Sequence, residues 1–179
     1  MSYSSDRILL SSQREGQISR FRAWVLVVIP LFAILFQIYV PLFFPFAKVL
    51  DMPLLVVVYF AVMRRSQIQG LLIGALVGLA QDSLSKNWLG MFGIVDTLVG
   101  YFAASIGMRL DVDHPMLRLL LCFFFYVFHE LFYWIMRRAL LGQLVPFDPQ
   151  TTLVHGALNA LISIPLFLLL DKMKVSGTT

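Results

Sequence analysis

Charged side chains are scarce in this sequence of 179 residues. Asp, Glu, Lys and Arg supply 13% of the positions, hydrophobic residues supply 59%, and the mean hydropathy is +0.83. A soluble domain has about 25% charged and about 45–50% apolar residues. The segments 23–36 and 161–170 carry no charge at all, as lipid-facing helices require. The composition excludes an ordinary soluble domain and predicts an integral membrane protein.

Cysteine and the motifs of common enzymes are also missing. Cys122 is the one cysteine and lies in an apolar run, which excludes a disulfide framework and a cysteine-based metal site within one chain. The sequence contains no H-E-x-x-H, no phosphate-binding loop with a Lys and no G-x-S-x-G. Asp96, Glu130 and His155 lack the spacing of metal ligands. We expect no catalytic activity, no metal and no cofactor.

The positive net charge has a topological explanation. A charge of +4 and a pI near 9.5 would suggest nucleic-acid binding in a soluble domain, but no basic stripe interleaved with aromatic residues is present. Lys and Arg instead collect in cytoplasmic loops of membrane proteins. Counted on alternate sides of six apolar segments, ten lie on one side and four on the other. This predicts a multi-pass protein with both termini in the cytoplasm and no nucleic-acid partner.

Six apolar segments, separated by short charged or Pro/Gly-containing links, predict an all-α membrane protein. We expect a six-helix transmembrane bundle over 23–171, a polar cytoplasmic tail over 1–22 and a short cytoplasmic tail over 172–179. The helices are expected at about 23–44, 49–63, 68–84, 90–108, 116–136 and 153–170.

The second and third segments are short for spanning helices. Their fifteen and seventeen residues reach only about 22–26 Å across a hydrocarbon core of about 30 Å. A single fused helix would bury Arg64 and Arg65 near the bilayer centre, which is costly. We therefore expect these arginines in a tight surface turn between two short helices.

The third segment carries Gly70, Gly74, Gly78 and Asp82 at i, i+4 spacing, which sets them on one helix stripe. Small residues on one stripe let another helix backbone approach closely, so we interpret it chiefly as a packing face. A groove for a ligand or a lipid tail is the alternative. Asp82 in the last turn opposes the helix dipole. It should either bond backbone N–H groups of the following turn or face a polar cavity or a partner.

Ionisable residues within the later segments fall toward the outer side of the predicted topology. A buried, unpaired charge is costly in lipid, so we expect these residues to pair with one another. Such a network could serve the architecture, or it could recognise a partner or ligand, and the sequence leaves both open. His129 points about 100° away from Glu130 on a helix and is expected only to pack. The predicted outer network comprises Asp82, Asp96, Glu130, Arg137 and His155.

The link at 139–147 is apolar for a segment that faces water. Such a segment either lies in the membrane interface, which we favour, or is covered by another protein.

At the junction of the third and fourth segments, the sequence resembles the MreD family, rod shape-determining membrane proteins of bacteria. Chain length and the six-segment hydropathy also fit, and the resemblance covers about 50–175. The pattern is Gly74-x3-Gly78-Leu79-x2-Asp82-x2-Ser85-x3-Leu89-Gly90, followed by Thr97-x2-Gly100-Tyr101.

The resemblance implies a non-enzymatic scaffold subunit of the cell-elongation machinery in the inner membrane. Its implied partners are the bitopic protein MreC, the actin-like MreB and the synthases that build lateral peptidoglycan. It also implies a fold similar to the substrate-binding subunits of vitamin transporters. A small-molecule-binding subunit of an energy-coupled transporter is therefore the alternative function. The family positions matched here are Gly74, Gly78, Asp82, Ser85, Leu89 and Gly90.

Overall fold

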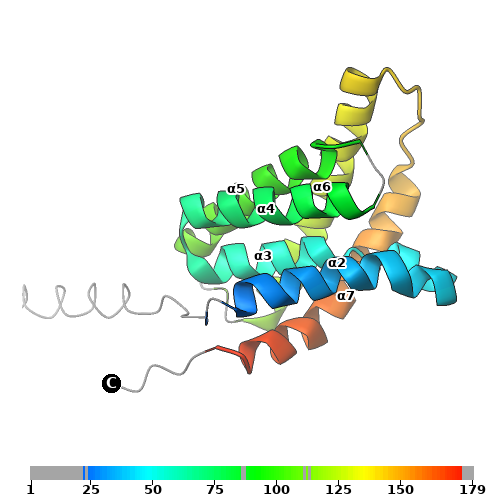
Figure 1. The fold of residues 1–179 in the computed structure, drawn as a ribbon. Helices are drawn as coiled ribbons and strands as arrows, with labels where there is room; N and C mark the ends of the chain where they lie inside the picture. Colours follow the sequence, from blue (N-terminus) through cyan, green and yellow to red (C-terminus); the bar gives the residue numbers. More distant parts are fainter. Residues whose placement is uncertain (1–21, 23, 86–87, 111, 113, 175–179) are drawn as a thin grey trace, which may run out of the picture.

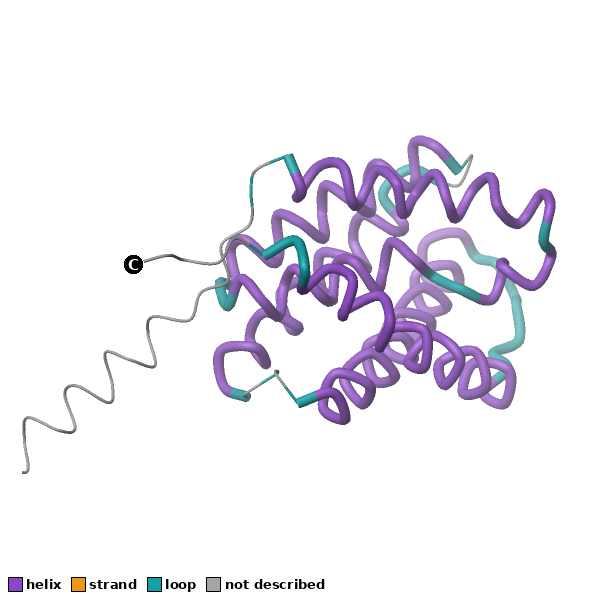
Figure 2. Tube along the Cα trace, turned by 90° about the horizontal axis from the view of Figure 1, so that it is seen from below, coloured by secondary structure: helices purple, strands orange, loops and turns teal. Residues whose placement is uncertain are grey.

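The computed structural model describes residues 22, 24–85, 88–110, 112 and 114–174. Most of the predicted 1–22 tail, and the predicted C-terminal tail beyond Lys174, lie outside these residues. The described chain forms six α-helices and one short 3-10 helix, with no strand among these residues (Figures 1 and 2). The elements are α2 (Val25–Phe43), η1 (Pro45–Val49), α3 (Met52–Arg64), α4 (Gln67–Leu84), α5 (Met91–Arg109), α6 (Pro115–Leu141) and α7 (Pro149–Asp171).

The predicted all-helical, six-helix class is confirmed for the described residues. Four helices, α2, α5, α6 and α7, are long and apolar enough to cross a membrane. Helix α3 is apolar but has only 13 residues. It is buried inside the bundle, so its length need not match a lipid core. Spanning by all six helices remains a proposal.

Helix α6 and helix α7 depart most from the expected boundaries. Helix α6 continues to Leu141, and Gly142 with φ 61° ends it in the left-handed region. Helix α7 begins at Pro149, where the Asp148 side chain accepts hydrogen bonds from the first turn. The hydropathy pattern predicted both helices too short. The α6 extension begins with Arg137 and Arg138, and the first turn of α7 is polar, so neither looks like part of an apolar segment. The resulting hairpin projects away from the other helices (Figure 1).

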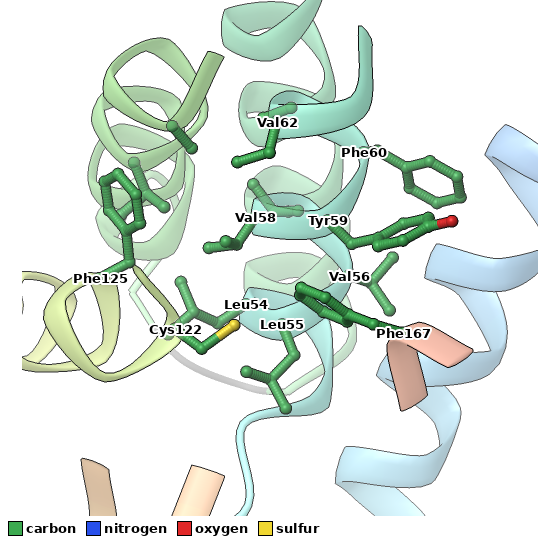
Figure 3. Close-up of a cluster of buried hydrophobic side chains, with 14 of the residues drawn as sticks. Leu54, Leu55, Val56, Val58, Tyr59, Phe60, Val62, Cys122, Phe125 and Phe167 are labelled. Atoms are coloured by element: carbon green, nitrogen blue, oxygen red, sulfur yellow. The ribbon is translucent and has the colours of Figure 1, made fainter. Parts of the chain in front are cut away.

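Helix α3 is the centre of the bundle. Every residue from 53 to 63 is buried, which is the pattern of a helix surrounded by other helices. Figure 3 shows Val58 and Tyr59 of this helix among Cys122 and Phe125 of α6 and Phe167 of α7. The interior here is filled by side chains, which gain dispersion contacts that lipid would not supply as densely.

The turn after α3 contains Arg64 and Arg65. Helix α3 ends at Arg64, Arg65 adopts φ 49°, and α4 starts at Gln67. The polypeptide thus reverses within two residues, as the cost of burying two guanidinium groups in a fused helix requires.

Helices α4 and α5 are in backbone contact along the glycine stripe. A Cβ atom at Gly70 would lie 2.3 Å from the Gly100 carbonyl oxygen, and one at Gly74 would lie 2.0 Å from the Asp96 carbonyl oxygen. At Gly78 the corresponding distance is 2.4 Å, to Phe92. No side chain fits at these distances, so glycine allows the close approach. Helix α5 covers the stripe and leaves no room there for a ligand.

A polar clasp joins three helices at the end where α7 finishes. Tyr59 donates a hydrogen bond of 2.8 Å to Asp171, and Arg118 forms an ion pair of 2.5 Å with the same carboxylate. Arg118 also donates to the Val112 carbonyl, and Lys174 pairs with Asp171 at 2.7 Å. The clasp fixes α3, α6 and α7 relative to one another.

Candidate functional site

Asp82 caps the N-terminus of α5. Its carboxylate accepts backbone hydrogen bonds from Gly90 at 2.8 Å, Phe92 at 3.1 Å and Gly93 at 3.0 Å. The first turn of a helix has unpaired N–H groups and a positive dipole end, so a buried carboxylate is stabilised there. Gly90 precedes this turn with φ 94°, a conformation that favours glycine. Asp82 therefore links the end of α4 to the start of α5.

The remaining residues of the family pattern lie in this junction. Ser85 donates its hydroxyl hydrogen bond to the Gln81 carbonyl oxygen and closes the end of α4. Leu89 is exposed beside Gly90. The pattern thus combines a glycine contact, an acidic helix cap and the turn between them.

His129 lies between two carboxylates in the interior. Its Nε2 atom is 3.3 Å from Asp96 Oδ1 and its Nδ1 atom is 3.8 Å from Asp51 Oδ2. His129 and Asp96 are each 1% exposed. The expectation that His129 only packs was wrong, because α6 turns this imidazole toward α5 and the start of α3. The cluster of Asp51, Asp96 and His129 is called the buried triad below.

Aromatic stacking and an amide hold the buried triad in position. The Phe92 ring stacks on His129 at 5.7 Å between centroids and on Tyr133 at 4.7 Å. Asn159 of α7 accepts a 2.8 Å hydrogen bond from the Asp51 N–H and donates a 2.7 Å bond to the Val49 carbonyl. Four segments of the chain therefore meet at this cluster.

A second polar region forms a cavity of about 300 Å³ between α6, the 142–148 loop and α7. Predicted residues Glu130, Arg137 and His155 line it, together with residues that the sequence did not single out for this place. The full lining is Tyr126, Glu130, Tyr133, Trp134, Arg137, Val145, Pro146, Phe147, Asp148, Thr151, Thr152 and His155.

The loop beside the cavity is held against α6 by hydrogen bonds. Trp134 Nε1 donates a 2.8 Å hydrogen bond to the Val145 carbonyl, and Arg137 donates two hydrogen bonds, of 3.0 and 2.8 Å, to Gln143 Oε1. Phe147 packs on Trp134 with ring centroids 5.5 Å apart. Part of the predicted 139–147 link is helical, and Leu144 stays 83% exposed.

The five residues of the predicted outer network occupy three places. Asp82 caps α5, Asp96 belongs to the buried triad, and the other three line the cavity. Arg137 bonds to Gln143 rather than to Glu130. Glu130 lies between the cavity and the buried triad, since its Oε1 atom is 3.9 Å from His129 Nδ1.

Sequence reasoning missed Asp51, His129 and Asn159. Asp51 could have been found, because an Asp two residues before Pro53 is typical of a helix N-cap, and it does accept a bond from the Leu54 N–H. No local signal pairs residue 51 with residue 129 or 159. In the described part of the chain, no three His, Cys, Asp or Glu residues form a group suited to a metal ion.

Comparison with protein families settles the relationship of the chain. The family described as rod shape-determining protein MreD matches residues 19–173. The chain belongs to the MreD family. It is therefore a protein of rod-shape determination, a participant in the MreB/MreC shape machinery, and its four long apolar helices agree with the inner-membrane location of MreD proteins. MreD proteins are a structural family rather than a known enzyme class. Comparisons with curated proteins and with solved structures find no match.

Proposed function

We propose that this MreD protein is a membrane scaffold that binds an MreC-like bitopic protein and helps to organise lateral peptidoglycan synthesis. The observation that supports it most is the filled interior around α3. The α4–α5 contact is backbone against backbone, and residues 53–63 are buried by side chains on all sides. Among the described residues, a core packed this closely around α3 suits a protein that holds others in position.

The same proposal assigns an orientation. The first residues of α2, the α3–α4 turn and the end of α7 lie at the same end of the bundle (Figure 1). Arg64, Arg65, Arg109, Lys172 and Lys174 all occur at that end. By the positive-inside rule this end faces the cytoplasm, and the α6–α7 loop faces the outside. All six helices then belong to the membrane domain, with α3 shielded from lipid by its neighbours.

Affinity purification from the host membrane tests the scaffold proposal. The tagged full chain is extracted in mild detergent and its co-purifying proteins are identified by mass spectrometry. An unrelated tagged multi-pass protein of similar size is the matched control. Enrichment of an MreC-like protein over that control, and its binding to the purified chain alone in nanodiscs, is the expected result. Failure of the purified pair to bind would overturn the proposal.

The outer cavity supports a second candidate, a small-molecule-binding subunit of an energy-coupled transporter. The cavity has an aromatic and polar lining, as ligand sites do. Its volume of about 300 Å³ is at the lower limit for such sites. The same purification separates the two functions. Paired ATPases with a coupling membrane subunit would support the transporter, and their absence beside an MreC-like protein would exclude it.

A further inference from the structure

The cavity at the α6–α7 hairpin contains a carboxylate, Glu130, that has only a long ion pair, to His129, among the residues the structure describes. Glu130 lines the cavity, and no hydrogen bond reaches its carboxylate from the residues the structure describes. The nearest imidazole nitrogen, His129 Nδ1, is 3.9 Å from Glu130 Oε1, beyond hydrogen-bond range. A half-buried carboxylate without a hydrogen-bond donor has room to accept a closer cationic group.

The walls of the cavity suit a cation as well. Tyr126, Tyr133 and Trp134 contribute aromatic rings, which attract guanidinium and ammonium groups, as the Arg138 guanidinium 5.6 Å from the Trp134 ring centroid shows. The one arginine in the lining, Arg137, is already engaged, because it bonds to Gln143 and lies over the Tyr133 ring at 5.9 Å. It therefore cannot pair with Glu130 without breaking the contacts that close the loop.

We propose that the cavity binds an arginine or lysine side chain from an extracytoplasmic segment of the bitopic partner, with Glu130 as its counter-ion. The partner's identity rests on the proposed function, whereas the chemistry of the cavity does not. A volume of about 300 Å³ is at the small end for ligand sites, which suits one inserted side chain.

A protein segment fits this mouth better than a phospholipid headgroup. Asp148 adds a second, exposed carboxylate to the lining, and Arg137, which could attract the phosphate of a lipid headgroup, already bonds to Gln143. The neighbouring loop offers an exposed apolar side chain, Leu144, as a further contact for a polypeptide. In a segment with a basic side chain flanked by apolar residues, the basic group would pair with the carboxylates of the cavity and an apolar neighbour would contact Leu144.

Trp134 gives a direct readout of this site. The chain has three tryptophans, and Trp24 and Trp88 are exposed away from the cavity lining. Replacing those two with phenylalanine leaves Trp134 as the reporter in the full chain, embedded in nanodiscs. Its fluorescence is then titrated with N-acetyl-arginine amide and with the uncharged N-acetyl-citrulline amide, in the reporter chain and in its Glu130→Gln and Glu130→Asp versions.

We expect saturable binding of the arginine probe, weakened about tenfold or more by citrulline or by Glu130→Gln, and partly restored by Glu130→Asp. Equal binding of the two probes, or no saturable change, would overturn the proposal. An unchanged affinity in a folded Glu130→Gln protein would overturn it too. If Glu130→Gln does not fold, the proposal is tested by the affinities of the arginine and citrulline probes for the reporter chain with Glu130 intact.

A competition experiment with the purified MreC-like partner tests the proposed occupant of the cavity separately from the scaffold function. It should displace the arginine probe, whereas phosphatidylethanolamine added to the nanodiscs should not. Displacement by the lipid would overturn the protein occupant. Partner binding without displacement would remove this site and keep the scaffold. No partner binding would overturn the scaffold and the occupant together, even if the cavity still took the arginine probe.

Discussion

The α3–α5 core and the α6–α7 hairpin of this MreD protein are packed in different ways. In the core, a Cβ atom at Gly74 would lie 2.0 Å from a backbone oxygen, so the two helices touch directly. In the hairpin, a Cβ atom at Gly156 would meet only side-chain atoms of Phe123 and Tyr126, at 3.2 Å. Backbone cannot yield, whereas side chains can rotate. The core is therefore suited to fixing geometry and the hairpin to adapting around a partner.

The largest expected effect comes from Gly74→Ala. Its methyl group cannot coexist with the Asp96 carbonyl, so α4 and α5 must separate and lose contact along the whole stripe. We expect a loss of at least about 4 kcal/mol in the free energy of unfolding, measured by denaturant titration in mixed micelles.

Gly156→Ala is the matched control for that change. It adds the same methyl group to α7, where aromatic side chains need to shift by only tenths of an ångström. We expect a change within about 1 kcal/mol of either sign. Equal losses for the two substitutions would show that the core and the hairpin do not differ in rigidity.

His129→Leu is expected to have the next largest effect. It removes the group between Asp96 and Asp51 and leaves two buried carboxylates facing an apolar side chain. Breaking a buried ion pair from one side costs about 3–5 kcal/mol, so we expect about 3 kcal/mol. The same titration measures it, with the exposed His114→Leu as the control. A loss no greater than that of the control would mean that the buried triad has no energetic role.

Much of the architecture follows from local patterns, whereas the triad does not. The apolar segments, the arginine turn and the glycine stripe each depend on residues close in sequence, where spacing predicts geometry. Asp51 and His129 are 78 positions apart, and only the tertiary packing of α3 against α6 joins them. Hydropathy also ended α6 too early, because the helix continues past Arg137 and Arg138 beyond the apolar run. Residues that meet across helices were therefore the ones that sequence reasoning missed.

Asp82→Ala is expected to weaken the core less than the preceding changes. It leaves the N–H groups of Gly90, Phe92 and Gly93 without their acceptor, partly within reach of water at the junction. We expect a loss of about 2 kcal/mol and earlier hydrogen exchange at the start of α5. Asp82→Asn, which keeps one carbonyl oxygen, should recover part of the loss. Unchanged exchange in the first turn of α5 would argue against the capping role.

Asp148→Ala tests the corresponding cap in the hairpin, and its effect should be the smallest. Asp148 accepts hydrogen bonds from the Thr151 side chain and from the Gln150 and Thr151 N–H groups, at the surface. The Thr151 bonds lower the pKa of the Asp148 carboxyl below its ordinary value of 3.8. The folded state thus favours the charged form, so the cap stabilises α7 above the unfolded pKa and loses its effect as pH falls through the lowered folded pKa. The stability difference between the wild type and Asp148→Ala should therefore be present at pH 7 and shrink below about pH 4. Denaturant titrations at both pH values measure it, and a difference that grows on acidification would reverse the sign and contradict the cap.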